Sequence, residues 1–200
     1  KSKVTIFFYS AMMNIILFSR NQLKHRPEQL RTMFAAIEHH GFEYSVNEDF
    51  ANIIESLTDI RIDAQHRYTI SPSHSQNSVI VTYGGDGTLL DALSLRPTPD
   101  TPIVGINCGR LGYLTADNGE GIEELFGRIA EQKLNFEQRH MLKVESSLSD
   151  IMPLALNEVT IHRHGATMIS VEVLINGKTI STYHGDGLRV STPTGSTAYS

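Results

Sequence analysis

Two glycine-aspartate-glycine turns carry the residues best suited to nucleotide chemistry. The first lies in the pentapeptide Gly84 to Thr88 (Gly-Gly-Asp-Gly-Thr), directly after the apolar run Val79 to Tyr83. Its glycines let backbone N–H groups approach a phosphate or ribose without an intervening Cβ atom. A carboxylate held among them, that of Asp86, can orient a hydroxyl group or a hydrated divalent cation. The simpler interpretation is a tight turn in which Asp86 caps the helix that follows.

The second turn, Gly185 to Gly187, opens a longer segment that is rich in hydroxyl groups. A strand-like run ends at Thr192, and Pro193 and Gly195 then constrain the loop that continues to Ser200. Serine and threonine hydroxyls suit the recognition of adenine edges, ribose and phosphate, and Tyr199 offers a stacking face. A solvated low-complexity loop is the alternative, but the ordered mixture of Pro, Gly, Ala and Tyr argues against it.

Two smaller groups of polar residues accompany these turns. Asn107 to Tyr113 (Asn-Cys-Gly-Arg-Leu-Gly-Tyr) follows a short apolar run, so we expect a second ligand loop lined by Asn107 and Tyr113. The alternative is an ordinary connection with Arg110 in solvent. Asn157 and Glu158 stand side by side in a strand pattern and therefore point to opposite faces. Whichever of them is buried needs a partner or a ligand, unless the pair lies at a polar edge.

Several common site types are absent from the sequence. There is no Gly-x-x-x-x-Gly-Lys-Ser/Thr phosphate loop and no Gly-x-Gly-x-x-Gly that opens a helix. A nicotinamide nucleotide, if bound, is thus expected to be a substrate rather than a redox cofactor. His162 and His164 alternate along a predicted strand, but no third ligand has suitable spacing, so we expect solvated or packed histidines and assign no metal-binding residue.

The amino-acid composition limits the binding partners and the cellular compartment to be expected for this protein. The 200 residues are 40% hydrophobic and 20% charged, as in ordinary globular proteins, and the net charge of -5 gives no basic field for nucleic acid. Cys108 is the one cysteine, which excludes an internal disulfide, suits the reducing cytoplasm and predicts a packed thiol. The apolar run Val4 to Phe18 is interrupted by polar residues and is shorter than the roughly 18 needed to span a membrane. We therefore expect no membrane association.

The residues before about position 137 alternate between strand and helix patterns. Val4 to Tyr9 is the predicted first strand, and the stretch from Ala11 to Arg26 is expected to be the loop after it. Pro27 and Gly41 bracket a predicted helix, and Asp59 to Asn77 is expected to be a weakly structured surface loop. Further elements are predicted in this order: strand Val79 to Tyr83, helix Thr88 to Leu95, strand Ile103 to Ile106, and a helix containing Ile122 to Ile129. This alternation predicts a parallel sheet covered by helices.

After about position 138 the helical pattern disappears. Five strands are predicted: Leu142 to Leu148, Leu154 to Arg163, Ile169 to Ile175, Thr179 to His184 and Leu188 to Thr192. Asn176-Gly177 is a strong hairpin signal between two of them. We therefore predict an α/β nucleotide-binding domain over residues 1–137 and the start of an all-β sandwich domain over residues 138–200. The chain ends inside a polar stretch, so we expect the second domain to continue beyond Ser200 and the 200 residues alone to be unstable or inactive.

Taken together, these segments resemble the NAD kinase family, and most closely its bacterial members. The resemblance covers residues 79–200, whereas residues 1–78 are only compatible with it and the stretch 11–26 departs from the usual loop after the first strand. The first motif is shared with diacylglycerol kinases, sphingosine-type kinases and phosphofructokinases. Gly185 to Ser200, with Asn157-Glu158 before it, is far more specific to NAD kinases. Cys108 stands where threonine is common.

The resemblance implies transfer of a phosphoryl group from ATP, or from inorganic polyphosphate, to the 2′-hydroxyl of the adenosine ribose of NAD. Asp86 would orient that hydroxyl as the catalytic residue, and a divalent cation such as Mg²⁺ would assist. Residues implied to bind NAD are Gly87, Tyr113, Asn157, Glu158, Asp186, Thr197, Ala198 and Tyr199. Residues implied to form the phosphate and nucleotide loops are Gly84, Gly85, Thr88, Asn107, Arg110, Gly195 and Ser196.

The family also implies a homo-oligomer, either a dimer or a tetramer. Two other functions remain open at this stage. A lipid kinase of the diacylglycerol type would share the Gly-Gly-Asp-Gly motif but would not predict Gly185 to Ser200. A non-catalytic NAD-binding sensor would retain the nucleotide loops without phosphoryl transfer.

Overall fold

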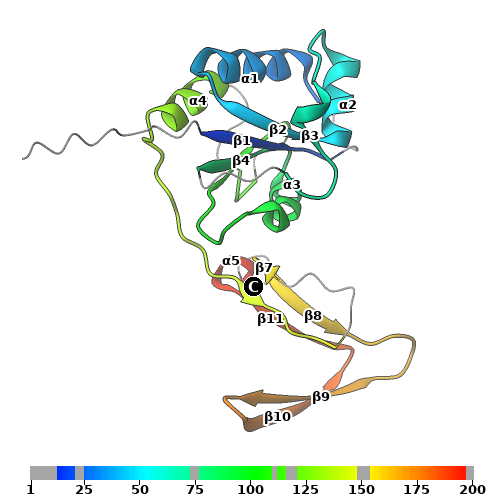
Figure 1. Cartoon of the computed structure of the whole chain (residues 1–200). Helices are drawn as coiled ribbons and strands as arrows, with labels where there is room; N and C mark the ends of the chain where they lie inside the picture. The colour runs from blue at the N-terminus through cyan, green and yellow to red at the C-terminus, as the bar shows by residue number, and fades with distance from the viewer. Residues whose placement is uncertain are drawn as a thin grey trace, which may run out of the picture. The chain divides into compact units, whose positions relative to one another are not determined.

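The chain folds into two compact units, residues 1–136 and 137–200 (Figure 1). The computed structural model describes residues 13–20, 25–72, 77–109, 112–115, 121–147 and 154–196. The first unit is α/β with a parallel sheet, and the second consists of small antiparallel sheets. The predicted fold class is confirmed at this level.

A five-stranded sheet forms the centre of the first unit, in the order β3-β2-β1-β4-β5 with every neighbouring pair parallel. Its strands are β1 (Asn14–Phe18), β2 (Glu43–Asn47), β3 (Arg67–Tyr68), β4 (Ser78–Tyr83) and β5 (Ile103–Ile106). Every residue of β4 is buried, as the unbroken apolar and β-branched run in the sequence predicts for a central parallel strand.

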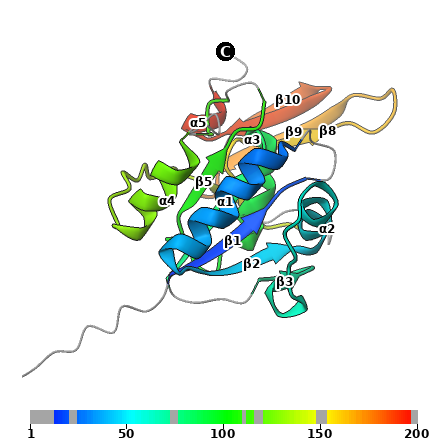
Figure 2. The ribbon, with the colours of Figure 1, turned by 90° about the horizontal axis from the view of Figure 1, so that it is seen from above.

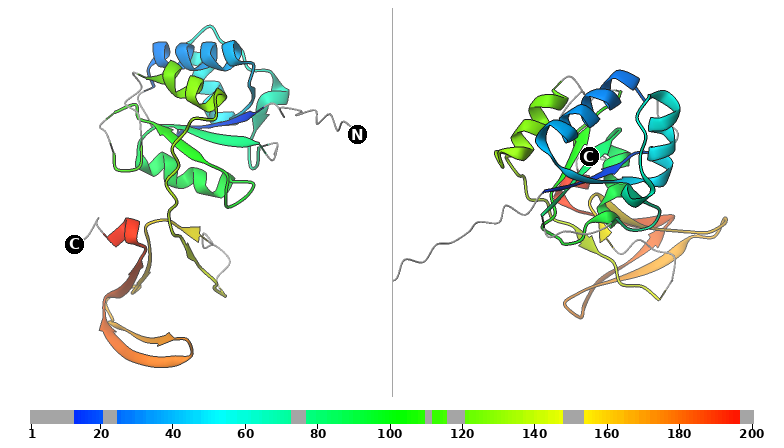
Figure 3. Two further views of the ribbon diagram at one scale, coloured as in Figure 1. Left: turned by 90° about the vertical axis from the view of Figure 1, so that its left-hand side faces the viewer. Right: turned by 45° about the horizontal axis from the view of Figure 1, so that its top comes forward.

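Helices cover both faces of this sheet. The helices α1 (Pro27–His40), α2 (Glu48–Leu57) and α4 (Ile122–Ala130) lie on one face. There they enclose the larger core with alternate residues of β1 and β4 (Figures 1 and 2). The opposite face carries α3 (Asp86–Asp91) and the 3-10 helix Ala92–Leu95, below the sheet in Figure 3, left. Its smaller core contains Ile16, Tyr68, Ile80 and Ala92.

The sequence signals at the ends of α1 act as predicted. Pro27 occupies the first turn, where its missing N–H is not needed. Gly41 adopts the left-handed conformation (φ 65°) and donates its N–H to the carbonyl of Glu38, while Phe42 N–H bonds to Ile37. Leu30 and Met33 face the core at helical spacing. The strands at positions 78–83 and 103–106 and the helix α4 are likewise confirmed.

The first strand was predicted in the wrong place. The structure puts β1 at Asn14–Phe18, inside the stretch that was expected to be a loop, while the predicted strand Val4 to Tyr9 lies outside the described residues. The run from Val4 to Phe18 contains two mainly apolar segments, Val4 to Tyr9 and Ile15 to Phe18, so local pattern alone does not show which of them pairs in the sheet. Pairing with β2 on one side and β4 on the other selects Asn14–Phe18 as the strand, and it buries Ile15 to Leu17 completely.

Two elements between Gly41 and Thr58 were not predicted from the sequence. The strand β2 is short and mixed in polarity, and only its place beside β1 defines it. The helix α2 does have a local signal, because the Asn47 side chain accepts a hydrogen bond from Phe50 N–H as an N-cap. In the predicted loop 59–77 the structure adds a 3-10 helix, Ala64–His66, and the two-residue strand β3.

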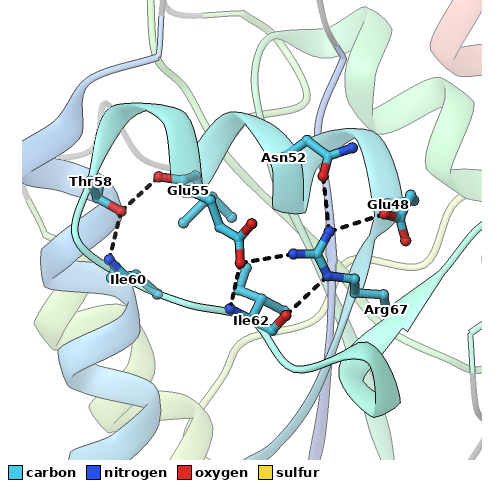
Figure 4. Close-up of polar contacts among 8 residues, drawn as sticks. Glu48, Asn52, Glu55, Thr58, Ile60, Ile62 and Arg67 are labelled. Atoms are coloured by element: carbon cyan, nitrogen blue, oxygen red, sulfur yellow. Dashed lines mark hydrogen bonds and ion pairs between the residues drawn. The ribbon is translucent and has the colours of Figure 1, made fainter.

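A guanidinium fixes β3 and the segment before it against α2 (Figure 4). Arg67 donates to Glu48 and Asn52 through Nη1 (3.0 and 2.9 Å), and its Nη2 lies 2.8 Å from Glu55 Oε1. Its Nε donates to the Ile62 carbonyl, and the same Glu55 oxygen accepts the Ile62 N–H at 2.9 Å. These contacts hold a segment that has little regular structure of its own.

Changing Glu55 to glutamine is expected to weaken the acid dependence of stability. The Ile62 N–H and the Arg67 guanidinium lower the pKa of Glu55 from its ordinary value of 4.5. A lowered pKa contributes stability that is present above pH 4.5 and is lost as the pH falls through the folded-state value. Urea midpoints should therefore fall more steeply below about pH 5 in the wild type than in Glu55→Gln. The control is Glu38→Gln, at an exposed position of α1, and equal acid slopes in all three proteins would contradict the assignment.

The second unit contains three two-stranded antiparallel sheets. The strand β6 (Leu142–Lys143) pairs with β7 (Leu154–Ala155), β8 (Glu158–His162) with β11 (Gly187–Ser191), and β9 (Ile169–Ile175) with β10 (Lys178–Gly185). A single turn of helix, α5 (Pro193–Ser196), follows β11. The predicted strand 142–148 is thus shorter in the described residues, and 154–163 is divided in two. The β9–β10 hairpin is curved (Figure 3). Its apolar residues Leu174, Ile175 and Ile180 are more than half exposed.

The hairpin turn between β9 and β10 confirms the Asn176-Gly177 signal. Both residues have positive φ angles, 53° and 76°, as a two-residue turn that matches the strand twist requires.

Among the residues described in either unit, no helix is long and apolar enough to cross a membrane.

Candidate active site

The first glycine turn and the loop that begins at Asn107 leave the sheet side by side. The strands β4 and β5 are parallel neighbours in which Tyr83 is paired with Ile106, and Gly84 N–H bonds to the Ile106 carbonyl at 2.8 Å. Both loops therefore start at the carboxyl edge of the sheet, where open α/β sheets bind ligands.

The Asp86 carboxylate is held by three backbone N–H groups of the neighbouring loop. Its Oδ2 accepts from Tyr113 at 2.8 Å, and its Oδ1 accepts from Leu114 and Thr115 at 3.1 and 3.2 Å. Asp86 is also the first residue of α3, so the helix fixes its backbone while the neighbouring loop holds its side chain. The carboxylate consequently has a defined orientation, beyond what the capping of a helix requires.

Gly112 of this loop packs directly against the Asp86 carboxylate. A Cβ atom at position 112 would lie 2.1 Å from Asp86 Oδ1 and 2.4 Å from its Cγ, far inside contact distance. Only glycine therefore fits beside Asp86 in this arrangement.

Asn107 organises its own loop. Its side chain is 1% exposed, donates to Thr115 Oγ1 at 3.0 Å and accepts from Gly109 N–H at 2.7 Å. Thr115 Oγ1 also accepts the Gly112 N–H at 3.3 Å. Asn107 thereby shapes the backbone that holds Asp86, whereas the Tyr113 side chain is 98% exposed.

The other residues of the pentapeptide differ in their surroundings. Thr88 is buried and its N–H bonds to the Gly85 carbonyl, whereas a Cβ at Gly85 would meet open space. A Cβ at Gly87 would lie 2.7 Å from the guanidinium of Arg20, which forms an ion pair with Asp91. Arg20 follows β1, so a third loop reaches this site.

Cys108 packs against the larger core, and burial raises the pKa of its thiol. It is therefore a poor nucleophile at neutral pH, in agreement with the packed thiol predicted from the sequence.

In the second unit, Asn157 and Gly195 come together. A Cβ at position 195 would lie 2.2 Å from the Asn157 carbonyl oxygen. Thr192 joins the two segments, because its N–H bonds to that carbonyl (2.8 Å), its hydroxyl donates to the Leu156 carbonyl, and the same hydroxyl accepts from Gly195 N–H. Ser196 N–H completes the turn by bonding to the Thr192 carbonyl.

Replacing Gly195 with alanine is expected to destabilise the protein by about 3 kcal/mol, because a backbone carbonyl blocks the added methyl group. Urea unfolding of the full-length protein measures the change. Gly185→Ala is the matched control, since a Cβ there meets nothing within 4 Å. Equal midpoints for the two variants would show that the turn at Gly195 can relax.

Glu158 and Asp186 lie at opposite ends of one strand pair. In the β8–β11 ladder, Ser191 is paired with Glu158 and Gly187 with His162. Asp186 precedes Gly187, so the two acids are separated by five residues, or roughly 17 Å, along the strands. Glu158 Oε2 is shielded from solvent and has no hydrogen-bond partner among the residues that the structure describes. Asp186 forms an ion pair with Arg163 at 2.6 Å. Asn157 and Glu158 are both half-buried, and it is this one oxygen of Glu158 that is placed to accept from a ligand.

Four predicted site residues, Arg110, Thr197, Ala198 and Tyr199, lie outside the described residues. His162 ends β8, so His164 lies beyond the strand and the two histidines do not alternate along it as predicted. Within the described ranges, no group of three or more His, Cys, Asp or Glu side chains is placed to hold a metal ion.

An open cavity of about 890 Å³ lies along the β3 edge of the first unit. Its lining includes Ser45, Glu48, Arg67 and Tyr68, and none of the residues that surround Asp86. The Arg67 guanidinium is already paired there (Figure 4), so this cavity offers no free cation for a phosphate.

Sequence reasoning missed several residues that build these sites. Thr115 and Thr192 each join two segments through hydrogen bonds that become apparent only in the folded structure. Arg20 was missed because the strand before it was misplaced. With β1 at Asn14–Phe18, its position just after a central parallel strand would have been a signal.

Comparison with known proteins agrees with this architecture. The model of the ATP-NAD kinase N-terminal domain matches residues 13–134, and that of the ATP-NAD kinase C-terminal domain matches residues 156–200. The NAD kinase of Bacteroides fragilis is 32% identical over 191 residues, which are 94% of this chain and 65% of that protein. The NAD kinase of Flavobacterium psychrophilum is 33% identical over 193 residues, 94% of this chain and 66% of that protein.

Two solved structures have a similar fold. The NADH kinase of yeast, complexed with NADH, superimposes with a TM-score of 0.69 at 24% identity, covering 96% of this chain and 60% of that one. An NAD kinase from Archaeoglobus fulgidus, in complex with ATP, gives a TM-score of 0.63 at 26% identity, covering 94% and 64%. The chain belongs to the NAD kinase family. It spans about two thirds of the length of the curated relatives it matches.

Proposed function

We propose that the protein is an NAD kinase, which transfers a phosphoryl group from ATP to the 2′-hydroxyl of the adenosine ribose of NAD and so makes NADP. The observation that carries this proposal is the Asp86 carboxylate, fixed by three N–H groups at the carboxyl edge of the sheet within a Gly-Gly-Asp-Gly turn. Membership of the family supplies the substrate.

Asp86 acts chiefly by orientation in this proposal. In a loose phosphoryl-transfer transition state the attacking hydroxyl needs alignment more than early proton removal. A carboxylate clamped through both oxygens keeps one direction while the hydroxyl hydrogen-bonds to it, and it can accept the proton as the bond to phosphorus forms.

The site suits a divalent cation that arrives with substrate phosphates. Mg²⁺ commonly binds through one or two carboxylates, several waters and substrate oxygens, and no protein cage is required. A carboxylate offers about four lone-pair directions, of which the three N–H groups occupy three. Asp86 therefore retains one, which serves either the substrate hydroxyl or the cation, and in the first case the cation would be held by substrate oxygens and water. When bound, such a cation would neutralise charge on the transferring phosphoryl group.

The second unit supplies recognition of NAD in this proposal. Asn157 and Glu158 bind polar groups of the adenosine. In support, Glu158 Oε2 is shielded from solvent and no donor in the described part of the chain reaches it. Asp186, roughly 17 Å away along the strands, binds the other end of the dinucleotide. The remaining proposed contacts to NAD are Gly87, Tyr113, Thr197, Ala198 and Tyr199. The proposed phosphate and nucleotide loops contain Gly84, Gly85, Thr88, Asn107, Arg110, Gly195 and Ser196.

The proposal also covers the phosphate donor, the oligomeric state and the cellular compartment. ATP is the expected donor and inorganic polyphosphate the alternative donor. A homo-oligomer, dimer or tetramer, in the cytoplasm is the expected form, and light scattering on the purified full-length protein measures its mass. The single cysteine supports a reducing compartment.

A substrate panel tests the proposed function. Full-length protein with γ-labelled ATP or polyphosphate, with and without a chelator, is expected to label NAD and to leave diacylglycerol and sphingosine unlabelled. Labelling of lipid alone would favour the lipid kinase alternative, and NAD binding without labelling of any acceptor would favour a sensor.

A further inference from the structure

Arg20 brings a positive charge to the Gly-Gly-Asp-Gly turn from a different part of the chain. It follows β1, whose parallel neighbour β4 leads into the turn. A Cβ placed on Gly87 would lie 2.7 Å from Arg20 Nη1, 3.4 Å from Cζ and 3.5 Å from Nη2. The guanidinium therefore lies directly against the residue after Asp86, in space that the absent side chain of Gly87 leaves open.

Asp91 determines how the guanidinium is presented. Its Oδ2 lies 2.5 Å from Arg20 Nε, so the carboxylate occupies the inner nitrogen. Among the described residues Asp91 is the one hydrogen-bonding partner of Arg20, and the Nη groups have none. An arginine held in this way keeps its outer N–H groups for a second acceptor, and their planar geometry matches phosphoryl oxygens.

An ion pair for stability alone does not account for these features. The side chains of Arg20 and Asp91 are 46% and 43% exposed, and pairs with that degree of exposure contribute little to stability. Nor does a purely stabilising pair require the guanidinium to lie against Gly87, the residue that follows Asp86 in the chain.

We propose that Arg20 is a phosphate-binding residue of the Asp86 site, positioned by Asp91, and that it contacts phosphoryl oxygens of a bound nucleotide. This inference rests on the proposed kinase function for its turnover measurements, and it extends that function to the loop after β1. The oxygens belong either to the phosphate donor or to the pyrophosphate of NAD, and separate measurements on the two nucleotides distinguish these sources.

Three variants of the full-length protein test the assignment. Arg20→Gln is expected to lower kcat/KM for one of the two substrates about 100-fold, and Arg20→Lys, which retains the charge without the fork, about 10-fold. Asp91→Asn breaks the same ion pair but keeps the guanidinium, so a loss of about threefold is expected. The melting temperatures of all three should agree closely with that of the wild type.

Calorimetric titrations with ATP, tripolyphosphate and NAD, each without the second substrate, identify the ligand independently of turnover. Weaker binding of ATP and tripolyphosphate to Arg20→Gln assigns the donor, and weaker binding of NAD assigns the dinucleotide. Equal losses in Arg20→Gln and Asp91→Asn, or unchanged binding of all three ligands to Arg20→Gln, would overturn the proposal. A wild-type protein that binds these ligands without making NADP would refute the kinase function and still leave the Arg20 titrations decisive.

Discussion

Replacing Asp86 with asparagine is expected to lower the turnover of NAD about 1,000-fold and to leave the dissociation constant of NAD within about threefold of the wild-type value. Asparagine preserves the size of the side chain but presents an amide N–H₂ in place of one carboxylate oxygen. If its oxygen accepts from Leu114 and Thr115, its N–H₂ group faces the Tyr113 N–H, and that donor loses its acceptor. The attacking hydroxyl then loses its fixed acceptor.

Stopped assays of NADP formation and titration with NAD measure the two parts of this expectation. The melting temperature of Asp86→Asn should be determined alongside them, since one unsatisfied N–H costs some stability. Wild-type turnover by the variant would remove Asp86 from the mechanism. A loss of NAD affinity as large as the loss of turnover would make Asp86 a binding residue instead.

Replacing Gly112 with alanine is expected to reduce turnover by at least about 100-fold, through the position of Asp86 alone. The added methyl carbon would lie 2.1 Å from Asp86 Oδ1, and the short aspartate side chain cannot move away without leaving its three N–H donors. A displacement of about 1 Å at a reacting group is enough for a loss of this size.

Gly109→Ala is the matched control for this variant because it lies in the same loop. A Cβ there meets nothing closer than 3.9 Å, and the Gly109 N–H that bonds to Asn107 remains. We expect its turnover to stay within about twofold of the wild-type value. Similar losses in both alanine variants would mean that the whole loop had been disturbed, and wild-type turnover by Gly112→Ala would contradict the clamp on Asp86.

Much of the fold follows from local signals in the sequence. Pro27 and Gly41 bound α1, and Asn176-Gly177 turns between β9 and β10, because each requirement is met by residues adjacent in the chain. Buried parallel strands such as β4 are readable for the same reason, as short apolar runs that end at glycine.

Elements defined by distant partners were not predictable in the same way. The strand β1 lies within a longer apolar run, and only its pairing with β2 and β4 selects Asn14–Phe18. The strands β2 and β3 are short and mixed in polarity, and β3 is held by Arg67 contacts to α2 that no local pattern contains.

The same distinction between local signals and distant partners holds for the candidate site. The glycine turn is enough to identify Asp86, but the groups that hold it come from positions 113–115. Arg20, just after β1, and Asp91, at the end of α3, likewise meet only in the folded chain. The residue types in the sequence indicate which chemistry is possible. The positions of those side chains depend on loops that β1, β4 and β5 bring together.

The most direct test of the proposed kinase is the position of the new phosphate on its product. Purified full-length protein, NAD, ATP and Mg²⁺ should yield a phosphomonoester whose ³¹P resonance couples to the H2′ proton of the adenosine ribose. Coupling to another ribose proton, or the absence of any phosphomonoester from NAD under conditions in which ATP and NAD both bind, would contradict the central claim.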